Sequence, residues 1–432
     1  MNFNHLKIAV ITLSIIVTLF LSAPLAAEEK LTFDEQLAQA DNIRSSQPKR
    51  FLTLLEALNQ NANNITEPQQ FYLDYLNLYL LMYQGQLADA IAAANTIINS
   101  NADVSLKFRA KMGLVNIFAI HQNWNQGLAT LSNLLAELPS IKDNNIQSLG
   151  LVVATIFYDL LGQYDLSLSY AKQVEKSSEQ GRMQCIAKSL IIQSSFNLKI
   201  LTPDNPDIRH TISLCRINKE HLYIALIHTY VAKMYLANQQ HQKALTLLQA
   251  NLQNALNTTY PHVIAEYYSL LAQAHWLGND LALTKQFAIK AIDNDKKEGT
   301  SEAKILSYKL LFELEKAQKN YEMALLYHEK YVVFDKAYYD ENQAKYLAFQ
   351  LAEHQTLEQK NKIDLLNETN ALLTAEKSLL TAEQALIKAK TQNNRYIMMV
   401  LIITLSVLSL WGFRLYKAHK AARGIRCTYR HF

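Results

Sequence analysis

The chain has few of the residues that turn a backbone: its 432 residues include only 10 glycines and 7 prolines. An average chain of this length carries roughly 30 glycines. All-β domains need turn residues about every 8–12 positions, and phosphate-binding loops need clustered glycines, so the sequence argues against both. Half of the residues are hydrophobic, which argues against a disordered chain. The composition therefore predicts an all-α protein.

Signatures of catalysis and of metal binding are also missing. Three cysteines are too few for a disulfide scaffold or a cysteine-rich zinc site. The 12 histidines are scattered without a metal-ligand spacing, and a net charge of +4 is too small to indicate a nucleic-acid partner. We expect no catalytic residues, no metal, no cofactor and no nucleic-acid binding, and hence a protein that is not an enzyme.

The N-terminus has the pattern of an exported protein. Lys7 precedes a largely apolar run over residues 8–21, and small residues follow up to Ala27. One basic side chain, a short apolar region and a small-residue cleavage site are typical of a secretory signal peptide. We predict a signal peptide over residues 1–27, with an uncleaved membrane anchor as the alternative.

A second apolar segment lies near the C-terminus. Residues 397–413 contain no charge and would span about 26 Å as a helix. Six basic residues and no acidic one follow: Arg414, Lys417, Lys420, Arg423, Arg426 and Arg430. Because basic flanks stay in the cytoplasm, we predict a transmembrane helix over 395–416 and a cytoplasmic tail over 417–432. Residues 28–394 would lie in the periplasm, in a single-pass protein of a bacterial inner membrane.

The region between these segments contains an internal repeat. A Gly, an amide or a Lys is followed two positions later by a bulky residue, and three positions after that by a small one. The units begin at Gly85, Gln122, Gly162, Gln239, Gly278 and Lys319. The spacings are near 39 except for one of 77, so one unit has lost the signature, and its turn is expected at residues 202–207, where two prolines break the helix. A period near 39 predicts stacked helical hairpins.

The second unit resembles the tetratricopeptide repeat family. Leu114, Phe118, Gly127, Leu131 and Pro139 match the offsets of its consensus. The longer period resembles degenerate, MalT-like arrays of that family. The resemblance implies a helical-hairpin solenoid, which we place at residues 28–340 with about eight hairpins.

Aromatic residues suggest a binding surface on this array. Tyr72, Tyr75, Tyr79 and Tyr83 share one helix face, which the repeat pattern places on the concave side. In a later unit, Tyr268 occupies the position that matches Tyr75, and His275 lies next to the position that matches Tyr83. Tyrosine gives a large contact area at low entropic cost, so these six residues are our candidate ligand-binding site. Ordinary core packing is the alternative.

Two of the cysteines belong to the unit without the signature. Cys185 and Cys215 lie 30 residues apart, a separation compatible with facing helices. An oxidising compartment permits a disulfide between them. Two small buried thiols are the interpretation that the sequence favours.

A coiled coil is predicted between the array and the membrane segment, over residues 341–394. A pair of apolar residues recurs every seven positions, and a strict seven-residue repeat favours a left-handed supercoil. The predicted dimer seam consists of Leu366, Leu373, Leu380 and Ile387. If these residues take the d positions of the heptad, the a positions include the polar residues Asn370, Lys377 and Gln384. Polar residues at a positions lower the stability of a coiled coil and specify its register. A parallel homodimer is favoured over a single solvated helix.

The order of segments resembles the sensor half of bacterial transmembrane signalling proteins, most closely those with a diguanylate cyclase output. The stretches 321–331 and 411–417 carry this resemblance. The cyclase motif Gly-Gly-Asp/Glu-Glu-Phe is absent, so the output domain is missing, as in a truncated or frameshifted product. We expect a protein that binds a peptide, a protein or a small ligand and transmits the event through the coiled coil. A membrane-tethered scaffold is the alternative, and a periplasmic enzyme is the third possibility.

Overall fold

The computed structural model describes residues 31–44, 47–178, 181–295 and 301–428, with side chains up to residue 421. The predicted signal peptide and Arg430 of the predicted tail lie outside the described residues. The chain divides into two compact units, residues 1–352 and 353–432. The described residues form helices and no strand, which confirms the predicted all-α class.

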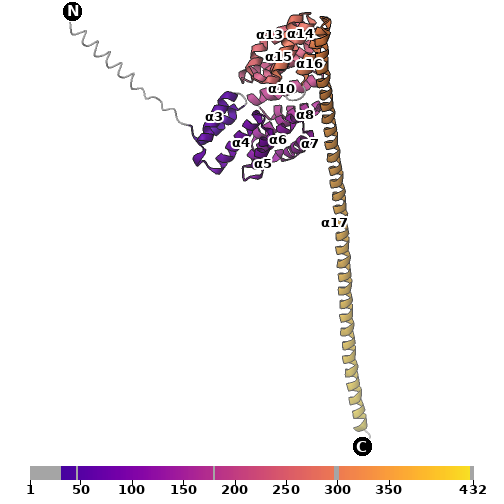
Figure 1. The fold of residues 1–432 in the computed structure, drawn as a ribbon. Helices are drawn as coiled ribbons and strands as arrows, with labels where there is room; N and C mark the ends of the chain where they lie inside the picture. The colour runs from indigo at the N-terminus through magenta and orange to yellow at the C-terminus, as the bar shows by residue number, and fades with distance from the viewer. Residues whose placement is uncertain (1–30, 45–46, 179–180, 296–300, 429–432) are drawn as a thin grey trace, which may run out of the picture. The chain divides into compact units, whose positions relative to one another are not determined.

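The first unit is a series of helical hairpins (Figure 1). Its helices are α2 (Phe33–Ile43), α3 (Pro48–Gln60), α4 (Glu67–Tyr83), α5 (Leu87–Asn99), α6 (Val104–Ile120), α7 (Trp124–Glu137), α8 (Asn144–Leu160), α9 (Tyr164–Ser177), α10 (Arg182–Asn197), α11 (Pro206–Ile217), α12 (His221–Ala237), α13 (His241–Asn257), α14 (Pro261–Leu277), α15 (Leu281–Asn294), α16 (Glu302–Ala317) and the start of α17 (Tyr321–Thr428). Short 3-10 turns, η1 (Ala62–Asn64) and η2 (Leu138–Ser140), follow α3 and α7. Paired in order, these helices make the eight hairpins that the repeat predicts.

The even-numbered helices form a continuous inner layer. Each of them from α2 to α16 contacts the next even-numbered helix, and no comparable contacts join consecutive odd-numbered helices within the described part of the molecule. The layer with the closer neighbours lies on the inside of a curved array. The inner layer therefore forms the concave side of the solenoid.

The repeat signature marks the turn within each hairpin. Its first residue has positive φ at Gly85, Gln122, Gly162, Gln239 and Lys319. The amide of the following residue donates to a carbonyl five positions earlier at 2.8–2.9 Å, which is the Schellman end of a helix. The bulky residue that comes next then starts the second helix.

Two details of the predicted repeat are wrong. In the turn of the α14–α15 hairpin the residue with positive φ is Asn279 rather than Gly278, so the small buried residue five positions later is Thr284 and not Leu283, which the predicted start at Gly278 implies. The predicted turn at 202–207 overlaps the connection between α10 and α11, residues 198–205, but the residue with positive φ there is Lys199, which lies before the predicted range. Lys199 restores a regular spacing, 37 residues after Gly162 and 40 before Gln239.

The small residue of the signature allows the two helices of a hairpin to pack closely. The residues at this position are all buried: Ala90, Gly127, Ser167, Ala244, Thr284 and Ala324. A Cβ atom on Gly127 would lie 2.5 Å from Cζ of Phe157, so any larger residue there would force the Phe157 ring or the helices to shift. Phe157 in turn packs edge-to-face on Trp124, with ring centroids 6.0 Å apart.

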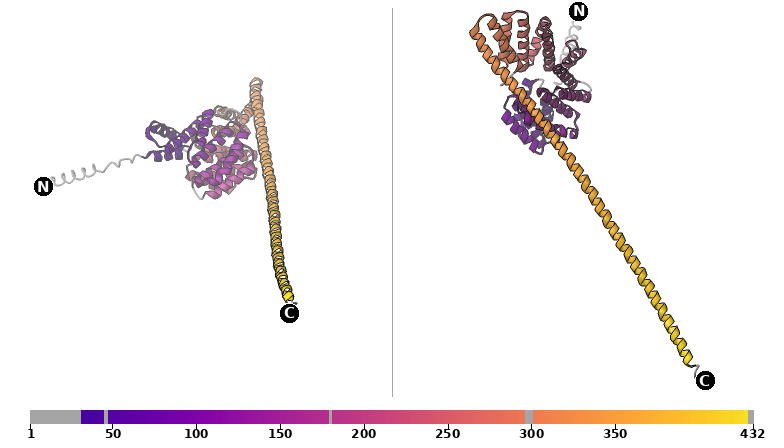
Figure 2. Two further views of the ribbon diagram at one scale, coloured as in Figure 1. Left: turned by 90° about the horizontal axis from the view of Figure 1, so that it is seen from below. Right: turned by 90° about the vertical axis from the view of Figure 1, so that its right-hand side faces the viewer.

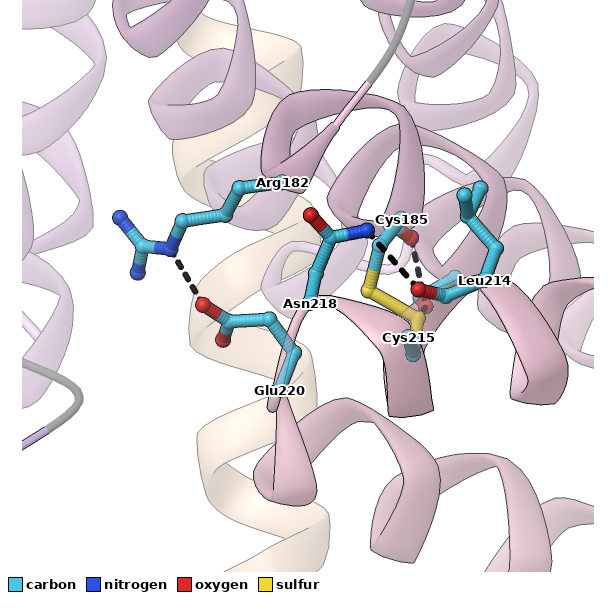
Figure 3. The surroundings of a disulfide bond; sticks show 7 residues. Arg182, Cys185, Leu214, Cys215, Asn218 and Glu220 are labelled. Atoms are coloured by element: carbon cyan, nitrogen blue, oxygen red, sulfur yellow. Dashed lines mark hydrogen bonds and ion pairs between the residues drawn. A yellow bond between two sulfur atoms is a disulfide. The ribbon is translucent and has the colours of Figure 1, made fainter.

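Cys185 and Cys215 form a disulfide, so the favoured prediction of two free thiols is wrong. The antiparallel packing of α10 and α11 brings their Cα atoms to 5.0 Å. Figure 3 shows the bond between these two helices, with Arg182 pointing to Glu220 nearby. The disulfide fastens the hairpin that has lost most of the signature residues.

The beginning of α17 belongs to the array beyond the predicted boundary at residue 340. Ala348 is buried in one hydrophobic cluster with residues of α6, α7 and α8, and Phe349 and Ala352 pack on the same cluster. Tyr338 donates a hydrogen bond to Glu302 of α16 at 3.1 Å. This segment, residues 338–352, is called the strap below, because it contacts α16 and also packs on the hydrophobic cluster of α6, α7 and α8.

The second unit is the continuation of α17, which is uninterrupted in both views of Figure 2. Among the described residues, α17 is the one helix long and apolar enough to cross a membrane. The seam residues Leu366, Leu373, Leu380 and Ile387 are 53–59% exposed in the single chain.

Candidate functional site

One ion pair identifies side chains on the concave side. Nη2 of Arg109 on α6 lies 2.6 Å from both carboxylate oxygens of Asp41 on α2. Helix α4 lies between them and contacts both α2 and α6. A bond that passes over a whole helix can form only where the inner helices converge, so Asp41 and Arg109 lie on the concave side.

The side chains of α4 beneath this bond complete an arginine–tyrosine cluster. Its members are Asp41, Arg44, Tyr72, Tyr75, Tyr79 and Arg109. The Tyr72 hydroxyl donates to Asp41 at 2.7 Å. The guanidinium carbon of Arg109 lies 4.2 Å from the ring centroid of Tyr75, and that of Arg44 lies 5.1 Å from the centroid of Tyr79.

The cluster carries more positive than negative charge. Arg44 and Arg109 both pair with Asp41. Burial lowers the pKa of Arg44, and the charges of Arg109 and Arg182 lower it further. Arg182 itself pairs with Glu220. Two guanidinium groups thus share one carboxylate in a partly desolvated place, where an unbalanced charge is costly.

Four of the predicted site residues lie in or beside this cluster. Tyr72, Tyr75 and Tyr79 are brought together, as their shared helix face predicts. Tyr75 is only 6% exposed, so the expectation of an open tyrosine face is wrong at that residue. Tyr79 is half-buried against Phe51, with ring centroids 5.7 Å apart, and Tyr83 is 57% exposed at the end of α4.

Tyr268 and His275 do not extend this surface. Both are buried on α14, and their rings stack on Phe287 of α15 at centroid distances of 6.0 and 5.5 Å. Their contacts are those of a hairpin core, where side chains of the two helices interdigitate. The predicted grouping of these two residues with Tyr72–Tyr83 is therefore corrected.

A second polar group lies further along the inner layer. Lys233 of α12 binds Glu266 of α14 at 2.7 Å and Glu302 of α16 at 3.0 Å. Burial opposes the charge of Lys233, but the two carboxylates outweigh it and raise the lysine pKa. The positive charge of Lys233 lowers the pKa of Glu302. This bridge again joins two helices across a third, so it lies on the concave side as well.

The same layer holds Asp159 on α8, which accepts hydrogen bonds from Gln193 at 2.6 Å and Asn197 at 2.9 Å. Burial raises the pKa of Asp159, while these two amides and the charge of Lys345 oppose the rise. Lys345 belongs to the strap, and its Nζ lies 5.1 Å from the Trp124 ring centroid. The strap thus contributes a charge to the concave polar surface.

Sequence reasoning missed the charged residues of both groups. Lys233 and Glu266 stand singly within helices whose neighbouring residues are mostly apolar, and Arg109 is the buried one among three basic residues of α6, beside Lys107 and Lys111. A lone charge inside a mostly buried helix needs a partner, and that signal was present in the sequence. Within the described ranges, no group of three or more His, Cys, Asp or Glu could hold a metal ion.

No family model and no curated protein matches the sequence. Several solved structures are similar in fold. A Rap protein complexed with competence and sporulation factor is 11% identical at a TM-score of 0.48, and the match covers 72% of this chain and 99% of that protein. NprR in complex with its cognate peptide NprX is 13% identical at a TM-score of 0.46, and the match covers 78% of this chain and 87% of that protein. Apo NprR from B. thuringiensis is 12% identical at a TM-score of 0.43, and the match covers 74% of this chain and 97% of that protein.

Proposed function

We propose that the protein is a membrane-anchored receptor of the helical-repeat type. Its concave surface would capture a peptide or a segment of a protein, and α17 would carry the resulting change toward the membrane. The proposal includes no catalytic role, and among the described concave groups the carboxylates of Asp41, Glu266 and Asp159 each bind a partner within the array.

The concave surface supports the binding part of the proposal. It offers tyrosine rings, arginine donors and buried carboxylates along one continuous layer of helices. Tyrosine and arginine are the residues that most often anchor protein interfaces. An extended segment lying along such a layer could contact several hairpins at once.

The single observation that carries the transmission part is the position of the strap. Tyr338 binds Glu302, which in turn binds Lys233 of the inner layer. Further along α17, Ala348 is buried in the hydrophobic cluster that includes Trp124 of α7 and Phe157 of α8. A ligand that changes the curvature between these hairpins would strain one of the two contacts. Because α17 is continuous, the change would pass into its later part.

The cellular setting is also part of the proposal. The apolar stretch of α17 suits a membrane span, and a disulfide suits an oxidising compartment such as the periplasm. A cytoplasmic output domain of the diguanylate cyclase type would complete such a receptor. Reading the genomic DNA after codon 432 in all three frames tests that part directly.

The receptor and scaffold proposals differ in what happens to the strap. The full-length protein in lipid nanodiscs is exposed to a random octapeptide pool, and amide hydrogen exchange is measured along α17. A receptor predicts at least a severalfold change in exchange over residues 338–352 when peptides are captured. A scaffold predicts capture with changes confined to the inner helices, and absence of capture would contradict both.

Two variants control this experiment. Ala348→Glu places a charge inside the hydrophobic cluster that includes Trp124 and Phe157, so the strap should exchange fast before any peptide is added. Ala344→Glu makes the same change one turn earlier at an exposed position, and its exchange should match that of the unmodified protein.

A further inference from the structure

The arginine–tyrosine cluster has donors that its own acceptor does not use. Asp41 already accepts from Arg109 and Tyr72 and pairs with Arg44. Nε of Arg109 is buried and has no hydrogen-bond partner among the described residues, in a side chain that is 9% exposed. Buried donors normally have partners, so this unsatisfied group points to an acceptor that binds there.

Arg44 presents a second set of donors toward the same place. Its contacts with Asp41 use Nη1 alone, which leaves the Nε–Nη2 edge without a hydrogen bond to any described residue. That edge is the one that binds a carboxylate with two parallel hydrogen bonds. The side chain is 18% exposed, so a ligand can reach it without opening the fold.

Aromatic rings hold both guanidinium groups in place. Arg109 lies over Tyr75, and Arg44 lies over Tyr79, with its distance to the Tyr75 centroid at 5.9 Å. Stacking fixes the planes of the guanidinium groups and reduces the entropy that binding would cost. Tyr83, exposed at the end of the same helix, adds a hydroxyl at the rim of the cluster.

We propose that this cluster is a subsite for a carboxylate of the bound ligand, with the Nε–Nη2 edge of Arg44 as its main contact. The inference rests on the proposed capture of a peptide or protein segment and adds the chemical group that is recognised. One carboxylate would balance the second guanidinium and leave the cluster neutral. The group can come from the C-terminus of a peptide or from an acidic side chain, since both offer the same two oxygens.

Three fluorescent octapeptide pools distinguish these sources, with the full-length protein in nanodiscs of uncharged lipid as the receptor. The first pool has a free C-terminal carboxylate and no Asp or Glu. The second is amidated and contains Asp and Glu. The third is amidated and contains neither. We expect the first or the second pool to bind at least about tenfold more tightly than the third, as charge-assisted hydrogen bonds imply.

Variants connect that preference to the cluster. Arg44→Gln should abolish the advantage of the carboxylate pools while leaving binding of the third pool unchanged, which also shows that the variant is folded. Arg44→Lys keeps the charge without the paired donors and should retain only part of the advantage. Arg50→Gln, on the exposed side of α3, is the matched control and should change nothing.

The possible failures can be told apart. Equal binding of all three pools, or an advantage that survives Arg44→Gln, would overturn the carboxylate subsite and leave peptide capture standing. Binding by none of the pools would overturn both proposals.

Discussion

At the residue scale, single small residues decide how closely the helices approach each other. Gly127 faces Phe157 at a distance that leaves no room for a methyl group. We predict that Gly127→Ala destabilises the protein by about 1–3 kcal/mol, the usual cost of overpacking, as measured by urea denaturation. Gly278→Ala, where the added Cβ would meet its neighbours at ordinary contact distances, serves as the control.

A double mutant isolates the cause. In a Phe157→Leu background, Gly127→Ala should cost clearly less, because the clashing ring atoms are gone. An unchanged cost would assign the effect to helix propensity or to another neighbour.

Another residue-scale prediction concerns His228, which is buried on α12. Burial, with help from the charge of Arg216, lowers its pKa from 6.5 to about 4. The unfolded protein therefore binds a proton between these values and the folded protein does not. Stability should fall as the pH drops from about 6.5 to about 4, and it should not depend on this group above that range.

His228→Gln removes this proton uptake, so the slope of unfolding free energy against pH should become shallower in that window. His210→Gln, at an exposed position of α11, should leave the slope as it was. Equal slopes for all three proteins would show that His228 titrates alike in both states.

The sequence predicted the residues that repeat and missed those that act singly. The turn residue and the small residue recur at a fixed spacing, so six units reinforced one another. Arg44, Arg109 and Lys233 stand at positions that carry no such residue in the other units. Arg109 pairs with Asp41, and Lys233 pairs with Glu302, in each case two hairpins away. Such pairs depend on the curvature of the array, which no local pattern encodes.

At the element scale, the disulfide compensates for a weak unit. The α10–α11 hairpin departs from the repeat signature, and Cys185–Cys215 closes a loop of 30 residues within it. The chain-entropy model gives roughly 3–4 kcal/mol for a loop of that length. We predict that Cys185→Ala with Cys215→Ala lowers the urea midpoint and exposes this hairpin to proteolysis. Cys427→Ser should have neither effect.

A thiol count tests the same bond in the unmodified protein. One reactive thiol should be found before reduction and three afterwards, under denaturing conditions. Three thiols before reduction would mean that the pair is not oxidised in the isolated protein. The register of α10 against α11 decided this pairing, and register could not be read from the spacing alone.

The strap shows that the array extends further along α17 than the sequence predicted. The sequence pattern placed the end of the array near residue 340, because the apolar spacing of α17 is helical throughout. Ala348 and Phe349 pack in one hydrophobic cluster with side chains of α6, α7 and α8, which lie far earlier in the sequence. A boundary set by long-range packing cannot be found from periodicity, which records only that a helix continues.

At the scale of the whole molecule, the later part of α17 presents apolar side chains that the single chain does not cover. The predicted seam residues are more than half exposed, and exposed rows of leucine favour association. A seven-residue period places such a row on one face only when helices supercoil. We therefore expect two copies of α17 to pair in parallel within one membrane.

Cysteine cross-linking in the membrane-embedded full-length protein tests this most directly. With Cys427 replaced by Ser, single cysteines at positions 366, 373 and 380 should form disulfide-linked dimers far more readily than cysteines at 368, 375 and 382. Equal cross-linking at the two sets, or none at either, would show that α17 has no dimer seam, and the transmission proposed for this receptor would be contradicted.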